Sequence, residues 1–158
     1  MQRVIILLGL ILWPLLISAQ EKSIPEVKAH FSAIIITDMD SSIVWYEKML
    51  GFEIIDKKEY AEAGFKQANL EVGNALLELI ELDSALEPKK VIAEYNSKTR
   101  LTGIFKIGFL VSEFDKSVDH FKKNDAEFHG NIVVDEKTGK RMVILKDPDE
   151  NRIQIFEN

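Results

Sequence analysis

The stretch that decides the fold is ITDMDSSIVWYEKMLGFEI, residues 36–54. The β-branched run at residues 33–37 predicts a strand, and Asp38 or Asp40 then caps a helix. Apolar side chains recur along that helix at near-helical spacing, so one face of it is expected to pack on a core. Gly51 stands just past the helix end, where a left-handed residue is favoured. The stretch therefore predicts a strand, a helix and a turn into further strands.

The same pattern returns 75 residues later, with Asp40 aligned to Asp115 and Tyr46 aligned to Phe121. Residues 106–111 predict a strand, and residues 116–124 predict a helix. The other strand-like runs are residues 52–56, 66–71, 75–82, 132–134, 142–145 and 153–156. The chain is thus predicted to be an α+β protein of two β-α-β-β-β modules. Neither module alone is large enough to bury a core, so the two should pair.

The N-terminal stretch is predicted to lie outside this fold. Arg3 precedes an uncharged apolar run at residues 4–19 that ends in Ser18 and Ala19, which is the layout of a secretory signal peptide. As a helix this run would span roughly 24 Å, less than a bilayer core. Cleavage after Ala19 would leave Gln20 first and place the protein in the periplasm or outside the cell. An uncleaved membrane anchor is the alternative.

The expected domain organisation follows from these boundaries. Residues 1–19 form the signal peptide and residues 20–158 form one domain. Within it, residues 28–83 are the first module, residues 103–157 are the second, and the polar residues 84–102 are a linker with room for one helical turn.

Composition excludes several classes of function. With 46% hydrophobic residues the chain is too apolar to be disordered. A net charge of -6, without a basic stripe, argues against a nucleic-acid partner. The absence of cysteine removes disulfides, thiolate zinc sites and thiol nucleophiles.

The repeated strand-helix pattern and the stretch KDPDENRIQIF at residues 146–156 resemble the vicinal oxygen chelate superfamily. That superfamily includes glyoxalase I, bleomycin-resistance proteins and extradiol dioxygenases. The resemblance implies that the two modules form a cup-shaped, incomplete barrel of mixed sheet. One departure is Glu150, which stands where the family usually has glycine.

The resemblance also implies four metal-ligand positions, which fall on Phe31, Glu78, Lys106 and Gln154. Only Glu78 is a good ligand, because phenylalanine has no donor, a protonated lysine repels a cation and an amide is a weak donor. We therefore expect no metal and no other cofactor, and metal-dependent lyase or transferase activity is disfavoured. The alternative is one divalent ion held by Glu78 and His30, which requires a β-bulge to turn His30 inward.

Strand alternation supplies the rest of the expected pocket. Its candidate residues are Phe31, Ile35, Glu78, Ile80, Lys106, Arg152, Gln154 and Phe156. If the family's cup is kept, the ammonium of Lys106 would lie near Glu78 and Gln154 and supply the positive charge that a metal otherwise supplies.

Three classes of function remain open. The first is an exported domain that binds a small, partly apolar or anionic ligand without the family metal. The second is a divalent-metal-dependent glyoxalase-like lyase, isomerase or transferase, and the third is an interaction module without pocket chemistry. The expected partners are a small-molecule ligand and, by resemblance, a second copy in a homodimer. No nucleic acid is expected, and no membrane contact beyond the signal peptide.

Overall fold

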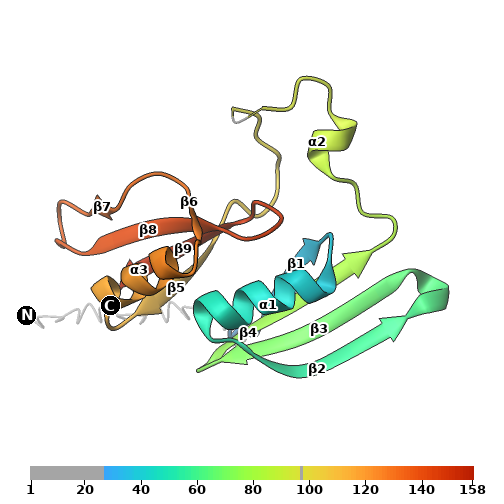
Figure 1. The fold of residues 1–158 in the computed structure, drawn as a ribbon, viewed down its shortest axis with the longest axis horizontal. Helices are drawn as coiled ribbons and strands as arrows, with labels where there is room; N and C mark the ends of the chain where they lie inside the picture. The colour runs from blue at the N-terminus through green and yellow to red at the C-terminus, as the bar shows by residue number, and fades with distance from the viewer. Residues whose placement is uncertain (1–26, 97) are drawn as a thin grey trace, which may run out of the picture.

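The computed structural model describes residues 27–96 and 98–158, and shows two modules that each place a helix against a sheet (Figure 1). The predicted signal peptide and its cleavage site lie outside the described residues. Across the two described ranges, no helix is long and apolar enough to span a membrane.

The first module is a four-stranded sheet with one covering helix. Its elements are β1 (Ser32–Ile36), α1 (Met39–Leu50), β2 (Glu53–Tyr60), the short 3-10 helix η1 (Ala61–Ala63), β3 (Phe65–Val72) and β4 (Ala75–Leu82). The strand order is β1-β4-β3-β2, with β1 parallel to β4 and the other pairs antiparallel. Asp38 caps α1 by accepting a 2.7 Å hydrogen bond from the Ser41 amide, and Gly51 ends the helix at φ 72°.

The second module repeats this plan with β5 in the place of β1. Its elements are β5 (Ile107–Val111), α3 (Phe114–Lys123), β6 (Glu127–Phe128), β7 (Val133–Val134), β8 (Arg141–Lys146) and β9 (Arg152–Glu157). The strand order is β5-β9-β8-β6, and β7 also pairs with β8. β5 is parallel to β9, and the other pairs are antiparallel. The predicted α+β fold with two sheets of mixed direction is confirmed.

The structure differs from the sequence-based expectation at three places. β2 continues to Tyr60, α3 begins at Phe114, and the two-residue strand β6 was not predicted. Polar side chains dominate the end of β2, so its hydrophobic pattern stops before its hydrogen bonds to β3 do. The linker contains one short helix, α2 (Pro88–Val91), and loops away from both sheets in Figure 1.

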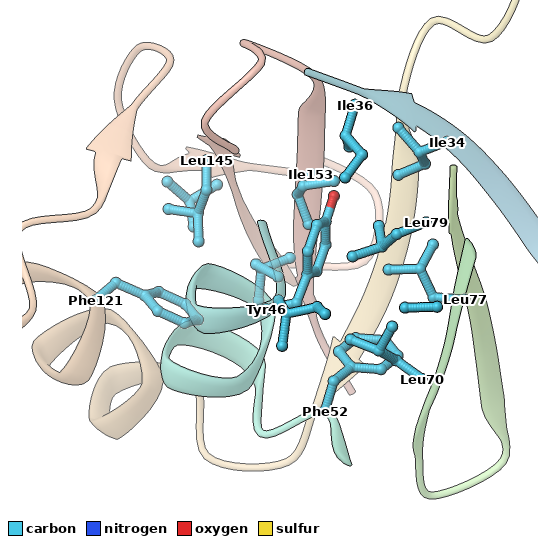
Figure 2. Packing of buried hydrophobic residues seen from close by; sticks show 14 of the residues in the cluster. Ile34, Ile36, Tyr46, Phe52, Leu70, Leu77, Leu79, Phe121, Leu145 and Ile153 are labelled. Carbon is cyan, nitrogen blue, oxygen red and sulfur yellow. The ribbon is translucent and has the colours of Figure 1, made fainter. Parts of the chain in front are cut away.

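Both modules bury their helix-facing side chains in one shared core. Tyr46 of α1 is fully buried, and Leu79 of β4 and Ile153 of β9 lie close to it in Figure 2. The Tyr46 ring packs edge-on against Phe52, which in turn contacts Phe109 of β5. Because both modules contribute to this one core, neither module needs a complete core of its own.

A five-residue turn between β8 and β9 fastens the second module to the first. The hydroxyl of Tyr46 donates a 2.9 Å hydrogen bond to the buried carboxylate of Asp147. The amide and hydroxyl of Thr37 both donate to Asp149, at 3.1 and 2.6 Å. Asn151 supplies two further hydrogen bonds to Asp147. These bonds fix the turn against the start of α1.

Candidate functional site

The candidate pocket residues lie on the sheet sides that face away from the helices. We call the side of the β1-β4-β3-β2 sheet that carries Glu78 the first cup face. We call the side of the other sheet that carries Gln154 the second cup face. Alternation along the strands assigns the remaining members. The first cup face consists of Phe31, Ala33, Ile35, Asp56, Lys58, Gln67, Asn69, Glu71, Leu76, Glu78 and Ile80. The second consists of Lys106, Gly108, Leu110, Met142, Ile144, Lys146, Arg152, Gln154 and Phe156.

The first cup face carries a row of acidic and amide side chains. Asp56, Asn69 and Glu78 are neighbours across β2, β3 and β4. The amide of Gln67 donates a hydrogen bond to a carboxylate oxygen of Glu78. A hollow of about 370 Å³ lies over this row, and its lining includes Phe31. The polar row and the apolar side chain of Phe31 give this face both hydrogen-bonding and hydrophobic character.

The second cup face carries a basic row instead. Lys146 and Arg152 are paired across β8 and β9. Lys106 directly precedes Ile107, and Ile107 is paired with Ile153, which places Lys106 beside Arg152 at the start of β5. Lys146 and Arg152 thus lie on adjacent strands, and extending the β5 register by one residue puts Lys106, which lies just outside β5, in the same row.

Gln154 lies one step along the second cup face from that row. It is only 2% exposed, its amide nitrogen donates to the sulfur of Met142, and its amide oxygen has no partner among the described residues. The ring of Phe156 covers Gly108 so closely that a Cβ there would lie 3.0 Å from it. Glycine at this position lets the phenylalanine ring lie flat on the sheet.

The two cup faces do not meet within one chain. Leu77 and Leu79 on either side of Glu78, and Ile153 and Ile155 on either side of Gln154, all belong to the shared core. Because adjacent strand residues point to opposite sides, both cup faces are turned away from that core. Figure 2 shows the core side chains of the two sheets converging between them.

This arrangement corrects one expectation. Lys106 and Gln154 share the second cup face, but Glu78 lies on the other sheet, so the prediction that Lys106 approaches Glu78 is wrong for a single chain. The other candidates divide the same way. Phe31, Ile35 and Ile80 lie on the first cup face, and Arg152 and Phe156 lie on the second.

The residues at the family's ligand positions do not fit a divalent metal. Phe31 is 57% exposed without any donor, and Glu78 is engaged by Gln67. Gln154 offers one amide oxygen and Lys106 is a cation. Across the described ranges, no three His, Cys, Asp or Glu side chains are grouped so that they could hold a metal ion. His30 is exposed and lines the same hollow as Glu78. Among the described residues, these two do not form a metal-binding group with a third His, Cys, Asp or Glu.

The electrostatics of the second cup face involve residues that sequence reasoning did not single out as a site. The guanidinium of Arg152 lies 4.6 Å from the ring centroid of Phe105. Desolvation, and then the charges of Arg152, Lys146 and Arg100, lower the pKa of His129. An imidazole with a lowered pKa is neutral at pH 7, so the positive field here comes from its neighbours. The alternation of side chains along residues 141–146 could have predicted that Lys146 lies beside Arg152. His129 could not be placed in this way, because it lies in a loop, where side chains do not alternate.

Asp147 is the other group missed as a contact point. Burial raises the pKa of this carboxyl above its ordinary value, while hydrogen bonds from Asn151 and Tyr46 oppose that rise. Its carboxylate is buried and accepts four hydrogen bonds, from Tyr46, Asn151 (two) and the Asp149 amide, which indicates a structural role. The sequence signal was present in the KDPDENRIQIF stretch, but its partner on α1 is 101 residues away.

Comparison with known proteins identifies the family. Residues 28–155 match the Glyoxalase/Bleomycin resistance protein/Dioxygenase superfamily. The chain belongs to this superfamily. A curated relative, the uncharacterized protein YwkD of Bacillus subtilis, is 29% identical over 128 residues, which cover 81% of this chain and 94% of the relative.

Solved structures from the superfamily share the fold. The glyoxalase family protein from Enterococcus faecalis superposes with a TM-score of 0.69 at 22% identity, covering 82% of this chain and 97% of that protein. The trypanothione-dependent glyoxalase I of Leishmania major has a TM-score of 0.61 at 20% identity, covering 84% and 87%.

Proposed function

We propose that this superfamily member is an exported domain that binds a small, partly apolar or anionic ligand on its cup faces without the family metal. The observation that carries the proposal is the replacement of three family ligand positions by Phe31, Lys106 and Gln154. These side chains can pack, attract an anion or donate a hydrogen bond, and none of them favours a divalent cation. A mainly apolar surface with a few polar points is typical of small-ligand sites.

A second copy of the chain is proposed to complete the pocket. Apolar side chains on both cup faces are open to solvent, with Phe31 57%, Ile35 55% and Leu110 67% exposed. Exposed apolar surface of this kind marks a binding or pairing site. A twofold dimer would set the first cup face of one copy over the second cup face of the other.

Charge supports the same pairing. Glu71 and Glu78 give the first cup face acidic character, while Asp56 is paired with Lys58 on the same face. Lys106 and Arg152 give the second cup face basic character. Complementary charges across an interface fix its register. Sedimentation should show a dimer that Ile35→Glu dissociates. Val44→Glu, at a 59% exposed residue on α1, is the matched control and should leave the dimer intact. A wild-type monomer at all concentrations would contradict this pairing.

Metal uptake tests the central claim. We expect the purified wild-type protein to retain no stoichiometric zinc, nickel or manganese and to gain no thermal stability when these ions are added. The matched positive control is the triple variant Phe31→His, Lys106→His, Gln154→Glu, which restores four ligand side chains together with Glu78. It should take up metal only as a dimer, because Glu78 and residue 154 lie on different sheets of one chain.

Two outcomes would overturn the proposed function, one for its metal-free part and one for its ligand-binding part. Tight stoichiometric metal in the wild-type protein would support the alternative, a metal-dependent lyase, isomerase or transferase. Failure of a chemically diverse ligand screen to raise the melting temperature would support an interaction module without pocket chemistry.

Export is tested separately by expressing the full chain and sequencing the N-terminus of the protein recovered outside the cytoplasm. The expected first residue is Gln20. Recovery of membrane-bound protein that still begins at Met1 would indicate an uncleaved anchor.

A further inference from the structure

The basic row on the second cup face is unusual for a chain of net charge -6. Lys146 is neutralised by Glu127, to which it donates a 2.5 Å hydrogen bond. By contrast, neither Lys106 nor Arg152 has a carboxylate within ion-pair distance in the part of the chain that the structure describes. Two neighbouring cations on an open sheet face thus lack a counter-charge.

Arg152 is also held in place. Its guanidinium stacks over the ring of Phe105 at 4.6 Å from the centroid, a favourable cation–π geometry. The N–H groups of Arg152 make no ion pair with a carboxylate of the described residues, so they are available to the carboxylate or phosphate of a ligand. The charges of Arg152, Lys146 and Arg100 all act on the nearby imidazole of His129 and lower its pKa, so these cations lie around one corner of the face.

The same face becomes apolar along the strands. Beyond the basic row come Ile144 and then Phe156 and Leu110, with Leu110 67% exposed. Arg152 and Phe156 are four residues apart on β9, which is about 13 Å along a strand. The surface therefore offers a cationic end and an apolar track that runs two residues, or about 7 Å, from the level of Ile144 to Phe156.

We propose that the second cup face binds an amphipathic anion, with its carboxylate or phosphate head at Lys106 and Arg152 and its apolar tail along Ile144, Phe156 and Leu110. This inference rests on the proposed ligand-binding function and names the class of ligand. The two cations supply the attraction, and the track supplies hydrophobic burial that a bare inorganic anion would not gain.

The test uses the full chain and three ligands with one tail, namely octanoate, octanol and octylammonium. Octanoate should bind most tightly, octanol at least tenfold more weakly, and octylammonium should not bind. Octyl phosphate should bind like octanoate, and inorganic phosphate should bind far more weakly than either. Amide chemical-shift changes should centre on residues near β5 and β9, and the amides of α2, which lies in the linker, should not move.

Variants locate the head group. Lys106→Gln and Arg152→Gln should each weaken octanoate binding about tenfold and leave octanol binding unchanged. Lys106 is exposed and unpaired, so this substitution should not affect folding even if the Arg152 variant does. Lys122→Gln on the exposed side of α3 removes the same charge and should change nothing.

Two results would overturn the inference differently. Equal binding of octanoate and octanol, insensitive to both substitutions, would leave an apolar pocket and remove the anion site. Binding of none of the ligands would remove the amphipathic site, and in that case the wider ligand screen decides whether the proposed function also fails.

Discussion

The two modules share a topology but contact each other through unequal turns. The five-residue turn after β8 places Asp147 under Tyr46 and Asp149 beside Thr37. At the equivalent place in the first module, β3 and β4 are joined by a two-residue turn, Gly73–Asn74. A groove of about 740 Å³ lies there, lined by this turn, by Ser112 and by α3. The comparison shows that the β8–β9 turn fastens its side of the module contact with several hydrogen bonds. On the other side the turn makes none within the described residues, and the helices are joined by a 2.8 Å hydrogen bond between a ring nitrogen of His120 and the carbonyl oxygen of Lys48.

A second comparison concerns the ion clusters at the helix starts. In the first module, Lys66 pairs with Glu81 at 2.7 Å, and Glu81 also accepts a hydrogen bond from the first amide of α1. In the second, Arg141 pairs with Glu157 at 2.7 Å and with Asp115 at 2.6 Å. Lys66 and Arg141 are 75 residues apart, as the repeat requires. The guanidinium of Arg141 bonds both to Glu157 on a strand and to Asp115 on a helix. In the first module Lys66 bonds to Glu81, and the link to the helix is the hydrogen bond from the backbone amide of Met39 to Glu81.

The largest expected effect comes from removing the hydrogen bonds that hold the β8–β9 turn against the first module. Asp147→Ala leaves the buried Tyr46 hydroxyl without an acceptor and removes the hydrogen bonds that order the turn. We expect the free energy of unfolding to fall by about 3 kcal/mol, measured by urea denaturation.

The control for this loss is Asn74→Ala in the two-residue turn between β3 and β4. Asn74 is exposed, so its replacement should change the free energy of unfolding by less than about 0.5 kcal/mol. Equal losses in the two variants would mean that the two turns contribute alike, and the comparison would fail.

A smaller effect is expected on the cup faces. Gln154→Leu removes a buried amide oxygen that has no partner in the described residues and replaces the side chain with one of similar size. The free energy of unfolding should rise by about 1 kcal/mol. Gln67→Leu on the first cup face breaks the hydrogen bond to Glu78 and should lower it by about 0.5 kcal/mol. A destabilised Gln154→Leu protein would indicate that the amide makes a contact essential to the fold.

The smallest effect concerns the arginine cluster and depends on pH. Hydrogen bonds from Arg141 lower the pKa of Glu157 from 4.5 to about 2. A lowered folded-state pKa contributes stability that is fully present above pH 4.5 and is lost as the pH falls toward about 2. Acid unfolding of Glu157→Gln should lack this part of the pH dependence. Glu136→Gln, at an exposed residue, should keep the wild-type profile.

Local sequence signals predicted most of the fold correctly. The alternating apolar residues of β1, β4 and β9 placed Ile34, Leu79 and Ile153 on the helix side, and all three are buried. Asp38 and Gly51 set the ends of α1 as expected. The two-residue strand β6 was missed, because so short a strand has no period to detect.

The sequence by itself determined which side of each sheet every candidate residue occupies, since strand alternation is a local property of the backbone. Through the family resemblance it also predicted that Phe31, Lys106 and Gln154 stand at metal-ligand positions. Only the tertiary structure decided that the two cup faces turn away from a shared core, and that Glu78 is therefore separated from Lys106. That outcome depends on how two amphipathic modules bury their helices against each other, through contacts between residues about 100 positions apart such as Tyr46 and Asp147.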